Sequence, residues 1–340
     1  MSDADRDGGI VKSADIRPDG NPRVLLVKTS SLGDVIHNLP VASDLRHRFP
    51  NAEIHWLVEE QYAPILEMHD GIDRIIPIAL RRWRKALWSA TNWREFLGAR
   101  RTLGQTHYNA IIDTQGLLKS ALFAKLAKGP IHGFGARTAR EPMASRFYDA
   151  RYEFAPETHK IERYRSVAAR AFSYTLDNFI DYGVAPQVPR PKLLERPYCV
   201  ILHSTARASK LWPEERWLAL IERLRAAGLG CILPWGSATE LRRSDRLAVR
   251  GGRTLAAPKL SLAELSALIA DAELVVGVDT GLMHLAAAFS RPVVGIFCDS
   301  NPVDACPTGP GPTAYRGEIG KPPTVEEVVS AIREVKPGLL

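Results

Sequence analysis

The stretch over residues 23–40 places the narrowest limits on how this chain can fold. It begins with an apolar, β-branched run at residues 24–27, which is typical of a buried strand. A turn of small residues follows at 29–33, and a helical pattern begins near Asp34. Strand, tight turn and helix start predict the first βα crevice of an open parallel sheet, where such folds bind ligands. Asp34 at this place fits a helix cap as well as a functional carboxylate.

The alternation of strands and helices continues along the first half of the chain. Strands are predicted at 53–58, 74–78 and 108–113, and helices at 42–49, 62–69, 92–103, 117–127 and 160–174. Pro40 is expected to kink or restart the first helix. Residues 132–135 are expected to form a loop, and the proline-rich stretch 183–197 reads as an interdomain linker.

The second half repeats the pattern, with strands predicted at 198–202, 230–234, 274–278 and 293–297 and helices after Pro213, at 262–269 and at 324–335. A chain of 340 residues exceeds the size at which one core stops growing. We therefore predict an α/β fold of two Rossmann-like, doubly wound domains. The predicted divisions are a disordered extension at 1–22, a first domain at 23–185, a linker at 186–197 and a second domain at 198–340, which ends in a helix.

Composition and charge narrow the class of protein. The 45% apolar and 24% charged fractions are those of a soluble globular protein, and no apolar run approaches the roughly 18 residues that span a bilayer. Four widely spaced cysteines indicate buried free thiols in a reducing compartment. Residues 22–190 carry 24 Lys and Arg against 17 Asp and Glu. This excess indicates an anionic partner: nucleic acid, anionic lipid or a phosphorylated substrate.

Several polar residues follow predicted strands of the second half. Thr280 and Gly281 open a helix directly after a strand, so the free backbone N–H groups there suit a phosphate; the plain alternative is a connection capped by Asp279. Lys210 supplies a point charge suited to a diphosphate, or is a surface residue. The remaining candidates in this half are the hydroxyls of Ser204 and Thr205, the ribose-binding carboxylate of Glu240, and His284 one turn beyond Gly281.

Other patterns exclude classes of enzyme. The chain has no GxxxxGK[ST] run and no GxGxxG after its first strand, which argues against a P-loop NTPase and a nicotinamide dehydrogenase. No His/Cys cluster with ligand spacing indicates an obligatory metal. The densest positive cluster, RRWRK at 81–85, directly follows a predicted strand. It is compatible with a solvated helix face or with an anion-binding site.

Six segments together resemble the ADP-heptose:lipopolysaccharide heptosyltransferases, glycosyltransferase family 9. They are KTSSLGDVIH at 28–37, RRWRK at 81–85, DTQGL at 113–117, TAREP at 138–142, KLWPE at 210–214 and DTGLMH at 279–284. The resemblance runs from about residue 23 to the C-terminus. The first two segments point to the members that add the first heptose. Family members often have two consecutive threonines where this chain has Thr205 and Ala206.

The resemblance implies a GT-B fold with its two domains facing across a cleft. The donor would be ADP-heptose, held mainly by the second domain, and the acceptor the Kdo sugar of Kdo₂-lipid A. The transfer would invert the anomeric centre and need no metal or cofactor. Asp34 would be the catalytic base, and Lys210 with the helix start at Thr280 and Gly281 would stabilise the leaving diphosphate. Donor contacts would also come from Ser204, Thr205, Glu240, Asp279 and His284. The acceptor would contact Ser31, Gly33, Arg81, Arg82, Arg84, Lys85, Gln115 and Arg140.

The expected location is the cytoplasm, peripheral to the cytoplasmic face of the inner membrane, with the basic first domain attracted to anionic lipid. One alternative is a related heptosyltransferase that uses a later core acceptor or another ADP-sugar donor. Another is a non-catalytic protein that binds a nucleotide sugar or nucleic acid. Nucleic acid is not the expected partner, because interleaved exposed aromatic residues and a helix-turn-helix pattern are both lacking.

Overall fold

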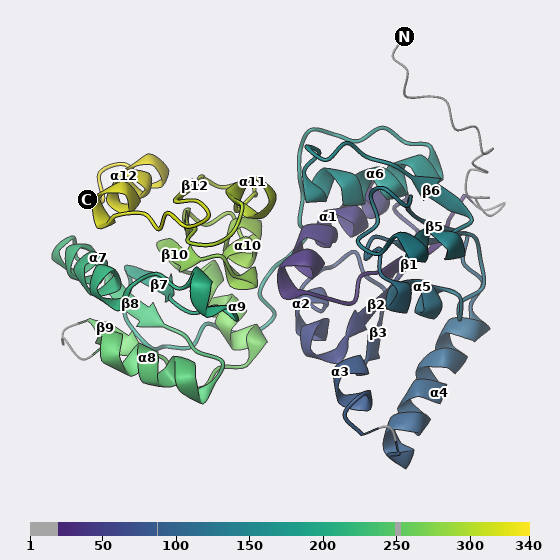
Figure 1. Cartoon of the computed structure of the whole chain (residues 1–340), viewed down its shortest axis with the longest axis horizontal. Coiled ribbons are helices and arrows are strands. Elements are labelled where there is room, and N and C mark those ends of the chain that lie inside the picture. Colours follow the sequence, from purple (N-terminus) through teal and green to yellow (C-terminus); the bar gives the residue numbers. More distant parts are fainter. Residues whose placement is uncertain (1–19, 87, 249–252) are drawn as a thin grey trace, which may run out of the picture. The chain divides into compact units, whose positions relative to one another are not determined.

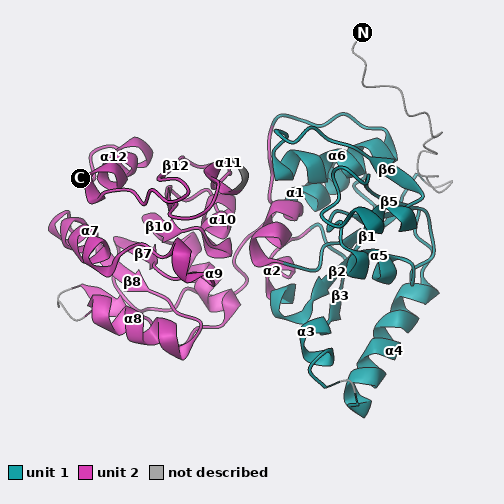
Figure 2. Cartoon of the chain, viewed as in Figure 1, with its two compact units in different colours: residues 1–30, 40–63, 71–178 teal, residues 31–39, 64–70, 179–340 magenta. Residues whose placement is uncertain are grey.

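The computed structural model describes residues 20–86, 88–248 and 253–340, apart from the side chains of residues 303 and 304. Residues 1–19 of the predicted extension lie outside this description. The chain forms two six-stranded parallel sheets with helices packed against them (Figure 1). It divides into two compact units, of which unit 1 comprises residues 1–30, 40–63 and 71–178, and unit 2 residues 31–39, 64–70 and 179–340 (Figure 2). The domain boundaries expected from the sequence stay predictions.

The first sheet lies in unit 1. Its strands are β1 (Arg23–Val27), β2 (Glu53–Glu59), β3 (Arg74–Ile78), β4 (Ala110–Asp113), β5 (Ile131–Phe134) and β6 (Ala150–Tyr152). The helical segments of this half are α1 (Leu32–Arg48), η1 (Glu60–Tyr62), α2 (Ala63–Leu66), α3 (Leu80–Trp83), α4 (Ala90–Gln105), α5 (Leu118–Ala124), η2 (Pro142–Phe147) and α6 (Lys160–Phe172). The strand order β3-β2-β1-β4-β5-β6 is that of a Rossmann sheet.

The second sheet lies in unit 2. Its strands are β7 (Tyr198–Leu202), β8 (Gly230–Leu233), β9 (Thr254–Ala256), β10 (Leu274–Val278), β11 (Val293–Ile296) and β12 (Thr313–Arg316). The helical segments are η3 (Ala208–Lys210), α7 (Glu214–Ala226), α8 (Ala238–Ala248), α9 (Leu262–Ala270), α10 (Gly281–Ala288), α11 (Pro302–Ala305) and α12 (Val325–Val335). The order β12-β11-β10-β7-β8-β9 repeats the Rossmann arrangement, so the predicted pair of doubly wound sheets is confirmed.

The central strands explain why the sequence folds this way. All four residues from Val24 to Val27 are fully shielded from solvent, as are all five residues of β10. Burial of both faces requires apolar side chains at every position, and β-branched residues pack well on a pleated surface. Helices therefore have to cover both sides of each sheet, which defines the doubly wound fold.

The strand register brings the candidate site residues together. In the first sheet, Val27 at the end of β1 pairs with Asp113 at the end of β4. In the second sheet, Leu202 at the end of β7 pairs with Gly277 of β10. Each pair of strands forms the point where the strand order reverses, and ligands bind outside the carboxyl ends of the strands at such points. Each sheet thus has one reversal point of the expected kind, and we call the strand ends and loops at that point the crevice of the unit.

Several local predictions are wrong. Residues 131–134 form strand β5 rather than a loop, and α1 continues through Pro40, so the helix does not restart there. The kink expected at Pro40 as the other possibility stays a prediction. The helix expected at 62–69 is only the short α2 after a 3₁₀ turn. Gly133 explains the first error: a Cβ at this position would lie 2.4 Å from the Tyr148 ring, so the buried strand needs the glycine that made the sequence resemble a loop.

Candidate active site

The crevice of unit 1 begins with a buried lysine. Lys28 follows β1 directly and is 2% exposed. Its Nζ donates a hydrogen bond of 2.7 Å to the carbonyl of Thr114 and lies 3.8 Å from the centroid of the Tyr164 ring. The ammonium therefore ties the loop after β1 to the loop after β4 and stabilises both at the edge of the sheet.

Gln115 holds the same two loops together. Its side-chain oxygen accepts hydrogen bonds of 3.0 Å from the backbone N–H groups of both Thr29 and Ser30. Gln115 in turn follows Asp113, which is fully buried and accepts from the Gln115 N–H at 2.8 Å and from the Tyr148 hydroxyl at 2.9 Å. Burial raises the pKa of the Asp113 carboxyl. Gln115, predicted to contact the acceptor, thus also fixes the shape of the turn that precedes α1.

The predicted acceptor residue Arg140 lies beside this crevice. Gly116 has φ of +63°, and a Cβ there would lie 3.2 Å from both the Arg140 nitrogen and the Phe134 ring. The backbone N–H of Glu141 donates to the Gly116 carbonyl. Glycine is required here because the loop approaches so closely in a left-handed conformation. The Arg140 side chain is exposed, and within the described part of the chain it has no side-chain partner.

Asp34 is the third residue of α1 and points back to the residue that precedes the helix. Its Oδ2 accepts from the Ser31 backbone N–H at 3.2 Å and from the Ser31 hydroxyl at 3.1 Å. This is the acidic half of a capping box, which satisfies a backbone donor at the start of the helix. The contact with Ser31 fixes the direction of the Asp34 carboxylate. Gly33, which was also predicted to contact the acceptor, lies between Ser31 and Asp34 in the sequence. The helix-capping role considered for Asp34 in the sequence analysis is therefore present in the structure.

The cluster at 81–85 separates into two kinds of cation. Arg82 forms ion pairs with Glu60 at 3.0 Å and with Glu95 at 2.8 Å, and these two carboxylates raise its pKa. The buried Trp83 donates its indole N–H to the same Glu95 at 2.8 Å. Arg82 is thus held by two carboxylates and connects α3 to α4. Its predicted contact with an acceptor stays a prediction.

The other cations of the cluster are differently placed. The backbone N–H of Arg81 donates to Glu59 at 2.8 Å, and its guanidinium contacts the Tyr62 hydroxyl at 3.3 Å. Arg84 and Lys85 are exposed, and among residues 20–86, 88–248 and 253–340 their side chains have no hydrogen-bond or ion-pair partner. These two cations are the ones available to bind an anion.

The crevice of unit 2 contains an ion pair between two predicted donor residues. Lys210 Nζ contacts Asp279 Oδ2, and both side chains are mostly buried. The Thr205 hydroxyl donates to the Asp279 carbonyl at 3.0 Å. Thr280 is the N-cap of α10 but its side chain makes no capping hydrogen bond, so Asp279 is not the cap. The first N–H groups of α10, beginning with Gly281, therefore lie beside an ammonium group at the end of β10.

Ser204 is positioned by a buried histidine. Its hydroxyl lies 2.8 Å from His203 Nδ1, and His203 Nε2 lies 2.8 Å from the Ser244 hydroxyl on α8. His203 is fully shielded from solvent, and burial lowers the pKa of its imidazole to about 4. The ring is therefore neutral near pH 7 and connects the two hydroxyls without adding charge.

Glu240 stabilises a helix start. Its Oε2 accepts from the backbone N–H of Gly236 at 2.6 Å and of Ser237 at 3.2 Å. The Lys259 ammonium donates to the Gly236 carbonyl at 2.8 Å and lies 4.8 Å from the centroid of the Trp235 ring. Glu240 thus caps α8, and its predicted contact with a ribose stays a prediction.

His284 is buried on α10 and faces a second histidine. Its Nδ1 lies 3.0 Å from Nε2 of His37, and the ring centroids are 4.2 Å apart. Both residues belong to unit 2, to which the first part of α1 contributes. A hydrogen bond between two imidazoles requires one ring to donate and the other to accept. Asp34 belongs to the same unit as Lys210 and Asp279.

Sequence reasoning did not select four residues that shape these crevices: Lys28, Asp113, His203 and Lys259. Three of them have a shared signal, because each directly follows or ends a buried apolar strand. Lys28 comes after Val27, Asp113 ends β4, and His203 comes after Leu202. A buried polar residue at the carboxyl end of a parallel strand lies at the ligand-binding edge of the sheet.

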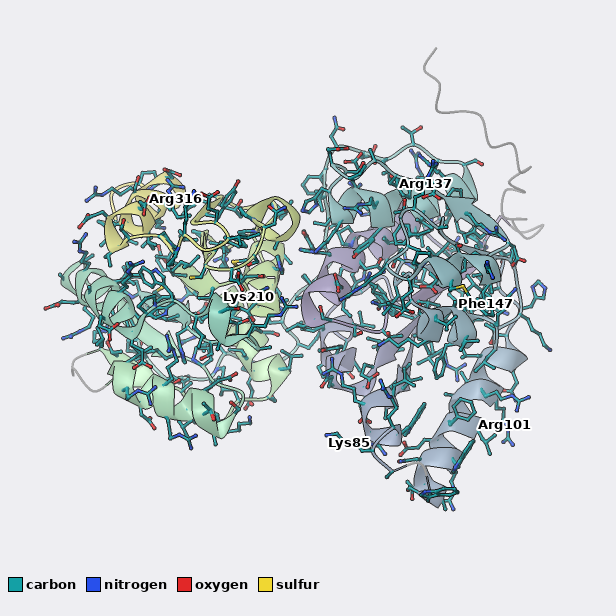
Figure 3. All side chains as sticks on the ribbon, viewed as in Figure 1. Lys85, Arg101, Arg137, Phe147, Lys210 and Arg316 are labelled. Atoms are coloured by element: carbon teal, nitrogen blue, oxygen red, sulfur yellow. The ribbon has the colours of Figure 1, made fainter. Side chains whose placement is uncertain are left out.

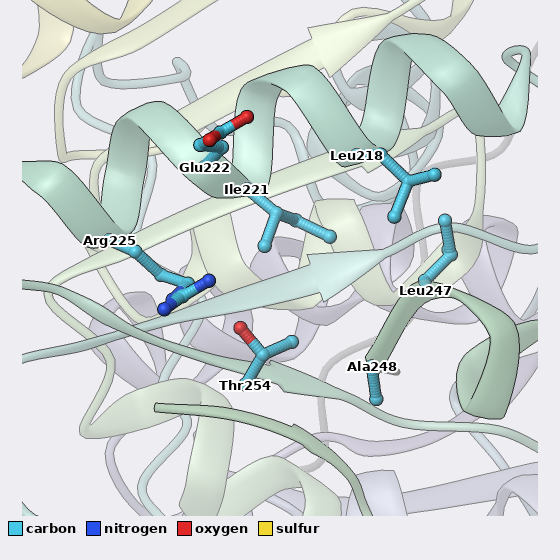
Figure 4. A pocket seen from close by; sticks show the side chains of 7 residues that line it. All are labelled: Leu218, Ile221, Glu222, Arg225, Leu247, Ala248 and Thr254. Atoms are coloured by element: carbon cyan, nitrogen blue, oxygen red, sulfur yellow. The ribbon is translucent and has the colours of Figure 1, made fainter. Parts of the chain in front are cut away.

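Two cavities of the molecule lie away from the crevice of unit 2, and none of the residues of that crevice lines them. One of about 330 Å³ in unit 2 is lined by α7, the end of α8 and β9, including Ile221, Arg225 and Thr254 (Figure 4). None of the predicted site residues lines it. Another, of about 450 Å³ in unit 1, lies between β3, α3 and α4 and includes Arg82 and Glu95 in its wall. The candidate site therefore consists of the crevices of unit 1 and unit 2, which lie at the carboxyl ends of the strands.

Two features are absent from the part of the chain that the structure describes. No group of three or more His, Cys, Asp or Glu side chains there is arranged to hold a metal ion. No helix in the same part of the chain has the length and apolar character that crossing a membrane requires.

Comparison with known proteins gives concordant matches. The model of the family "Glycosyltransferase family 9 (heptosyltransferase)" matches residues 96–331. Lipopolysaccharide heptosyltransferase 1 of Pseudomonas aeruginosa is 44% identical over 285 residues, which cover 82% of this chain and 79% of the relative.

Solved structures give the same result. The structure of E. coli heptosyltransferase WaaC with ADP superposes on this chain with a TM-score of 0.85 at 39% sequence identity. The superposed region covers 92% of this chain and 99% of the WaaC chain. The complex of WaaC with ADP-2-deoxy-2-fluoro heptose has a TM-score of 0.82 at the same identity and coverage. The similarity extends over both Rossmann-like sheets.

Proposed function

The chain belongs to glycosyltransferase family 9 and has its GT-B fold, and on this premise we propose that it transfers a heptose from ADP-heptose to the Kdo of Kdo₂-lipid A. The observation that supports this most directly is the crevice of unit 2, where Lys210, Asp279 and the start of α10 converge. A heptosyltransferase of similar sequence and fold has been solved with ADP and with an ADP-heptose analogue. The nucleotide-sugar donor is therefore the proposed ligand of this crevice.

The donor's diphosphate would lie beside Lys210 and the N-terminus of α10. Free N–H groups and the positive end of the helix dipole stabilise phosphate, and the ammonium adds a full charge. Asp279 holds the ammonium in place through the ion pair. As the bond between the heptose C1 and the diphosphate oxygen breaks, negative charge collects on ADP. Groups already in place to receive that charge stabilise the transition state more than the ground state.

Asp34 is the proposed general base. Its carboxylate would accept the proton of the attacking Kdo hydroxyl while that oxygen forms the bond to C1. The electron pair of the breaking bond leaves with ADP, so the configuration at C1 inverts in one displacement. Ser31 fixes the direction of the carboxylate through the N–H and hydroxyl contacts to Oδ2. Gln115 in turn fixes the loop that leads to Ser31.

The acceptor would be bound by the crevice of unit 1 and by exposed cations of the same unit. Arg84, Lys85 and Arg140 are suited to carboxylates and phosphates, because no described side chain neutralises them. Arg81 is the next candidate, whereas Arg82 is already paired with two acids. Such an arrangement accounts for the positive charge of residues 22–190.

We also propose that the reaction is independent of metal ions and takes place at the cytoplasmic face of the inner membrane. Lys210 and α10 supply the charge stabilisation that a divalent cation provides in other glycosyltransferases. The lipid acceptor requires access to a membrane surface. A later core acceptor or another ADP-sugar donor is the alternative, because neither crevice identifies the sugar.

Product analysis tests the proposal. The protein is incubated with ADP-heptose and Kdo₂-lipid A, with and without EDTA, and the product linkage is determined by NMR. We expect acceptor-dependent ADP release, an inverted anomeric linkage and no effect of EDTA. Transfer only to an acceptor that already carries heptose, or only from another ADP-sugar, would favour the alternative. Loss of activity with EDTA and recovery with a divalent cation would contradict metal independence.

A further inference from the structure

One face of α4 exposes apolar and basic side chains together. On a helix of 3.6 residues per turn, Trp93, Leu97, Arg100 and Arg101 lie within one outward sector, and Arg94 borders it. Trp93 is 56% exposed and Leu97 is 51% exposed. We call this face, together with Trp88 in the segment before the helix, the α4 surface.

The inward face of the same helix accounts for its stability. Ala99 and Leu103 are buried in the core of unit 1, and Phe96 packs edge-to-face against Trp83 and Phe123 at centroid distances of 6.0 and 6.2 Å. Ser89 caps the start of the helix. The fold of α4 thus depends mainly on its inner side chains; of the outer ones, the Trp93 ring contacts Phe96 edge-to-face at a centroid distance of 6.0 Å.

Trp88 is the most exposed large apolar residue in the part of the chain that the structure describes. It is 97% exposed, one residue before the N-cap of α4. Exposing a whole indole ring to water is unfavourable, since removing its large apolar surface from water stabilises a protein. A ring in this position is therefore expected to meet a partner that covers it.

The charges of the α4 surface are of one sign. Arg94, Arg100 and Arg101 are exposed and have no side-chain partner among the described residues. Glu95, the acidic residue on the helix, is directed to Arg82 and Trp83 and forms no pair with these three. Figure 3 labels Arg101 on α4 and Lys85, which follows the neighbouring α3. The α4 surface thus combines exposed rings with positive charge that no described carboxylate neutralises.

We propose that the α4 surface docks on a bilayer that contains anionic lipid, with Trp88, Trp93 and Leu97 inserted at the level of the headgroups. Tryptophan prefers the membrane–water interface, and a helix with apolar residues flanked by arginines is typical of interfacial binding. The inference rests on the proposed function, since an enzyme that acts on a lipid acceptor has to reach a membrane surface.

Charge complementarity selects the bilayer over a second copy of the chain. Two α4 surfaces face to face would bring together six unpaired arginines, and like charges repel. Anionic headgroups neutralise the same arginines, each contributing roughly a fivefold gain in partitioning. Loss of three cations is therefore expected to weaken binding roughly 100-fold, and high salt is expected to weaken the wild-type protein.

The test is co-sedimentation of the full chain with vesicles of 70% phosphatidylcholine and 30% phosphatidylglycerol, and with vesicles of phosphatidylcholine alone. The apolar variant carries Trp88→Ser, Trp93→Ser and Leu97→Ser, and the charge variant carries Arg94→Gln, Arg100→Gln and Arg101→Gln. Matched controls in unit 2 are Ile319→Ser, at a residue 61% exposed, and the exposed Arg242→Gln. Circular dichroism establishes that each variant is folded.

We expect the wild-type protein and both controls to bind the anionic vesicles, and each α4 variant to bind at least tenfold more weakly. Vesicles with brominated acyl chains should quench the fluorescence of the wild-type protein and not that of the apolar variant. Equal binding by the α4 variants and the wild-type protein would overturn the proposal. A concentration-dependent dimer that the α4 variants abolish would also overturn it, in favour of a second copy.

Activity distinguishes this inference from the proposed function. With an acceptor freed of its acyl chains, the α4 variants should release ADP at the wild-type rate. If the wild-type protein transfers heptose but the α4 variants bind vesicles as well as it does, only the docking surface would be rejected. Vesicle binding that depends on α4, without transfer to any acceptor, would reject only the proposed reaction.

Discussion

Lys210 and Asp279 form an ion pair at the switch point of the second sheet, beside the first turn of α10. Both side chains are mostly shielded from water, so the pair is held more firmly than an exposed one. The arrangement orients a cation at the position where the proposed diphosphate would leave.

Lys210→Ala should lower the rate of transfer by about 10²–10³, the usual effect of removing one preorganised donor to a developing charge. Initial rates at saturating ADP-heptose check this, and Lys321→Ala, which removes an exposed lysine of the same unit paired with Glu318, is the control. A loss confined to KM, with kcat unchanged, would indicate that Lys210 binds the ground state and the transition state equally and does not stabilise the transition state selectively.

Gln115→Leu should slow transfer and destabilise the fold by about 1–3 kcal/mol, because the N–H groups of the buried Thr29 and the half-buried Ser30 lose their acceptor. Urea unfolding and initial rates measure both effects. Gln115→Glu keeps an acceptor oxygen in place and should recover most of the stability. Equal destabilisation by both substitutions would show that the amide NH₂ group matters instead.

Buried neutral histidines should make the protein sensitive to mild acid. Burial lowers the pKa of His132, as of His203, from 6.5 to about 4. Between these values the unfolded chain binds a proton that the folded protein does not, so stability falls as the pH falls, by up to about 1.4 kcal/mol per unit for each histidine.

The substitution His132→Gln isolates one of these contributions, because His132 lies within β5 and outside the proposed contacts with substrate. Urea midpoints measured from pH 7 to pH 5 should fall less steeply for this variant than for the wild-type protein. Parallel curves would mean that the imidazole is protonated in the folded protein.

Gly133→Ala should destabilise the protein by about 1–3 kcal/mol, since the new Cβ would clash with the Tyr148 ring and force repacking. Gly98→Ala is the matched control: it lies within α4 with open space around its Cβ position and should be neutral or stabilising. Thermal unfolding of the two variants measures the difference. A neutral Gly133→Ala would show that Tyr148 can move aside.

The strongly apolar strands could be predicted from the sequence, and the weak ones could not. Predicted and observed bounds agree for β3, β7 and β10, where the last two are continuous apolar runs. Strands β5, β6, β9 and β12 have only three or four residues. Strands β5, β9 and β12 include Gly, His or Thr, and β6 includes the exposed Arg151, so the pairing partners of these strands, and not their own pattern, decide that they are strands. Helix α8 was not predicted, because only Ser244 and Leu247 of its described side chains are buried.

The candidate site was predictable as a set of positions but not as a set of contacts. Residues after β1, β4, β7 and β10 belong to the ligand-binding edges of two parallel sheets, which follows from the sequence pattern. Two kinds of contact depend on packing between distant segments: Gln115 accepts from Ser30, and Glu60 and Glu95 hold Arg82. Such contacts explain why Arg82 is paired with acids, whereas Arg84 and Lys85 of the same short motif are available to bind an anion.

The most direct test of the account is the effect of Asp34→Asn on ADP release with ADP-heptose and Kdo₂-lipid A. The asparagine oxygen can still accept from Ser31, so the helix cap is retained while the base is lost. We predict that acceptor-dependent release falls by at least about 10², with donor binding and thermal stability unchanged, whereas Asp245→Asn, at an exposed residue of α8, has no effect. Release at the wild-type rate in Asp34→Asn would contradict the account and restrict Asp34 to capping α1.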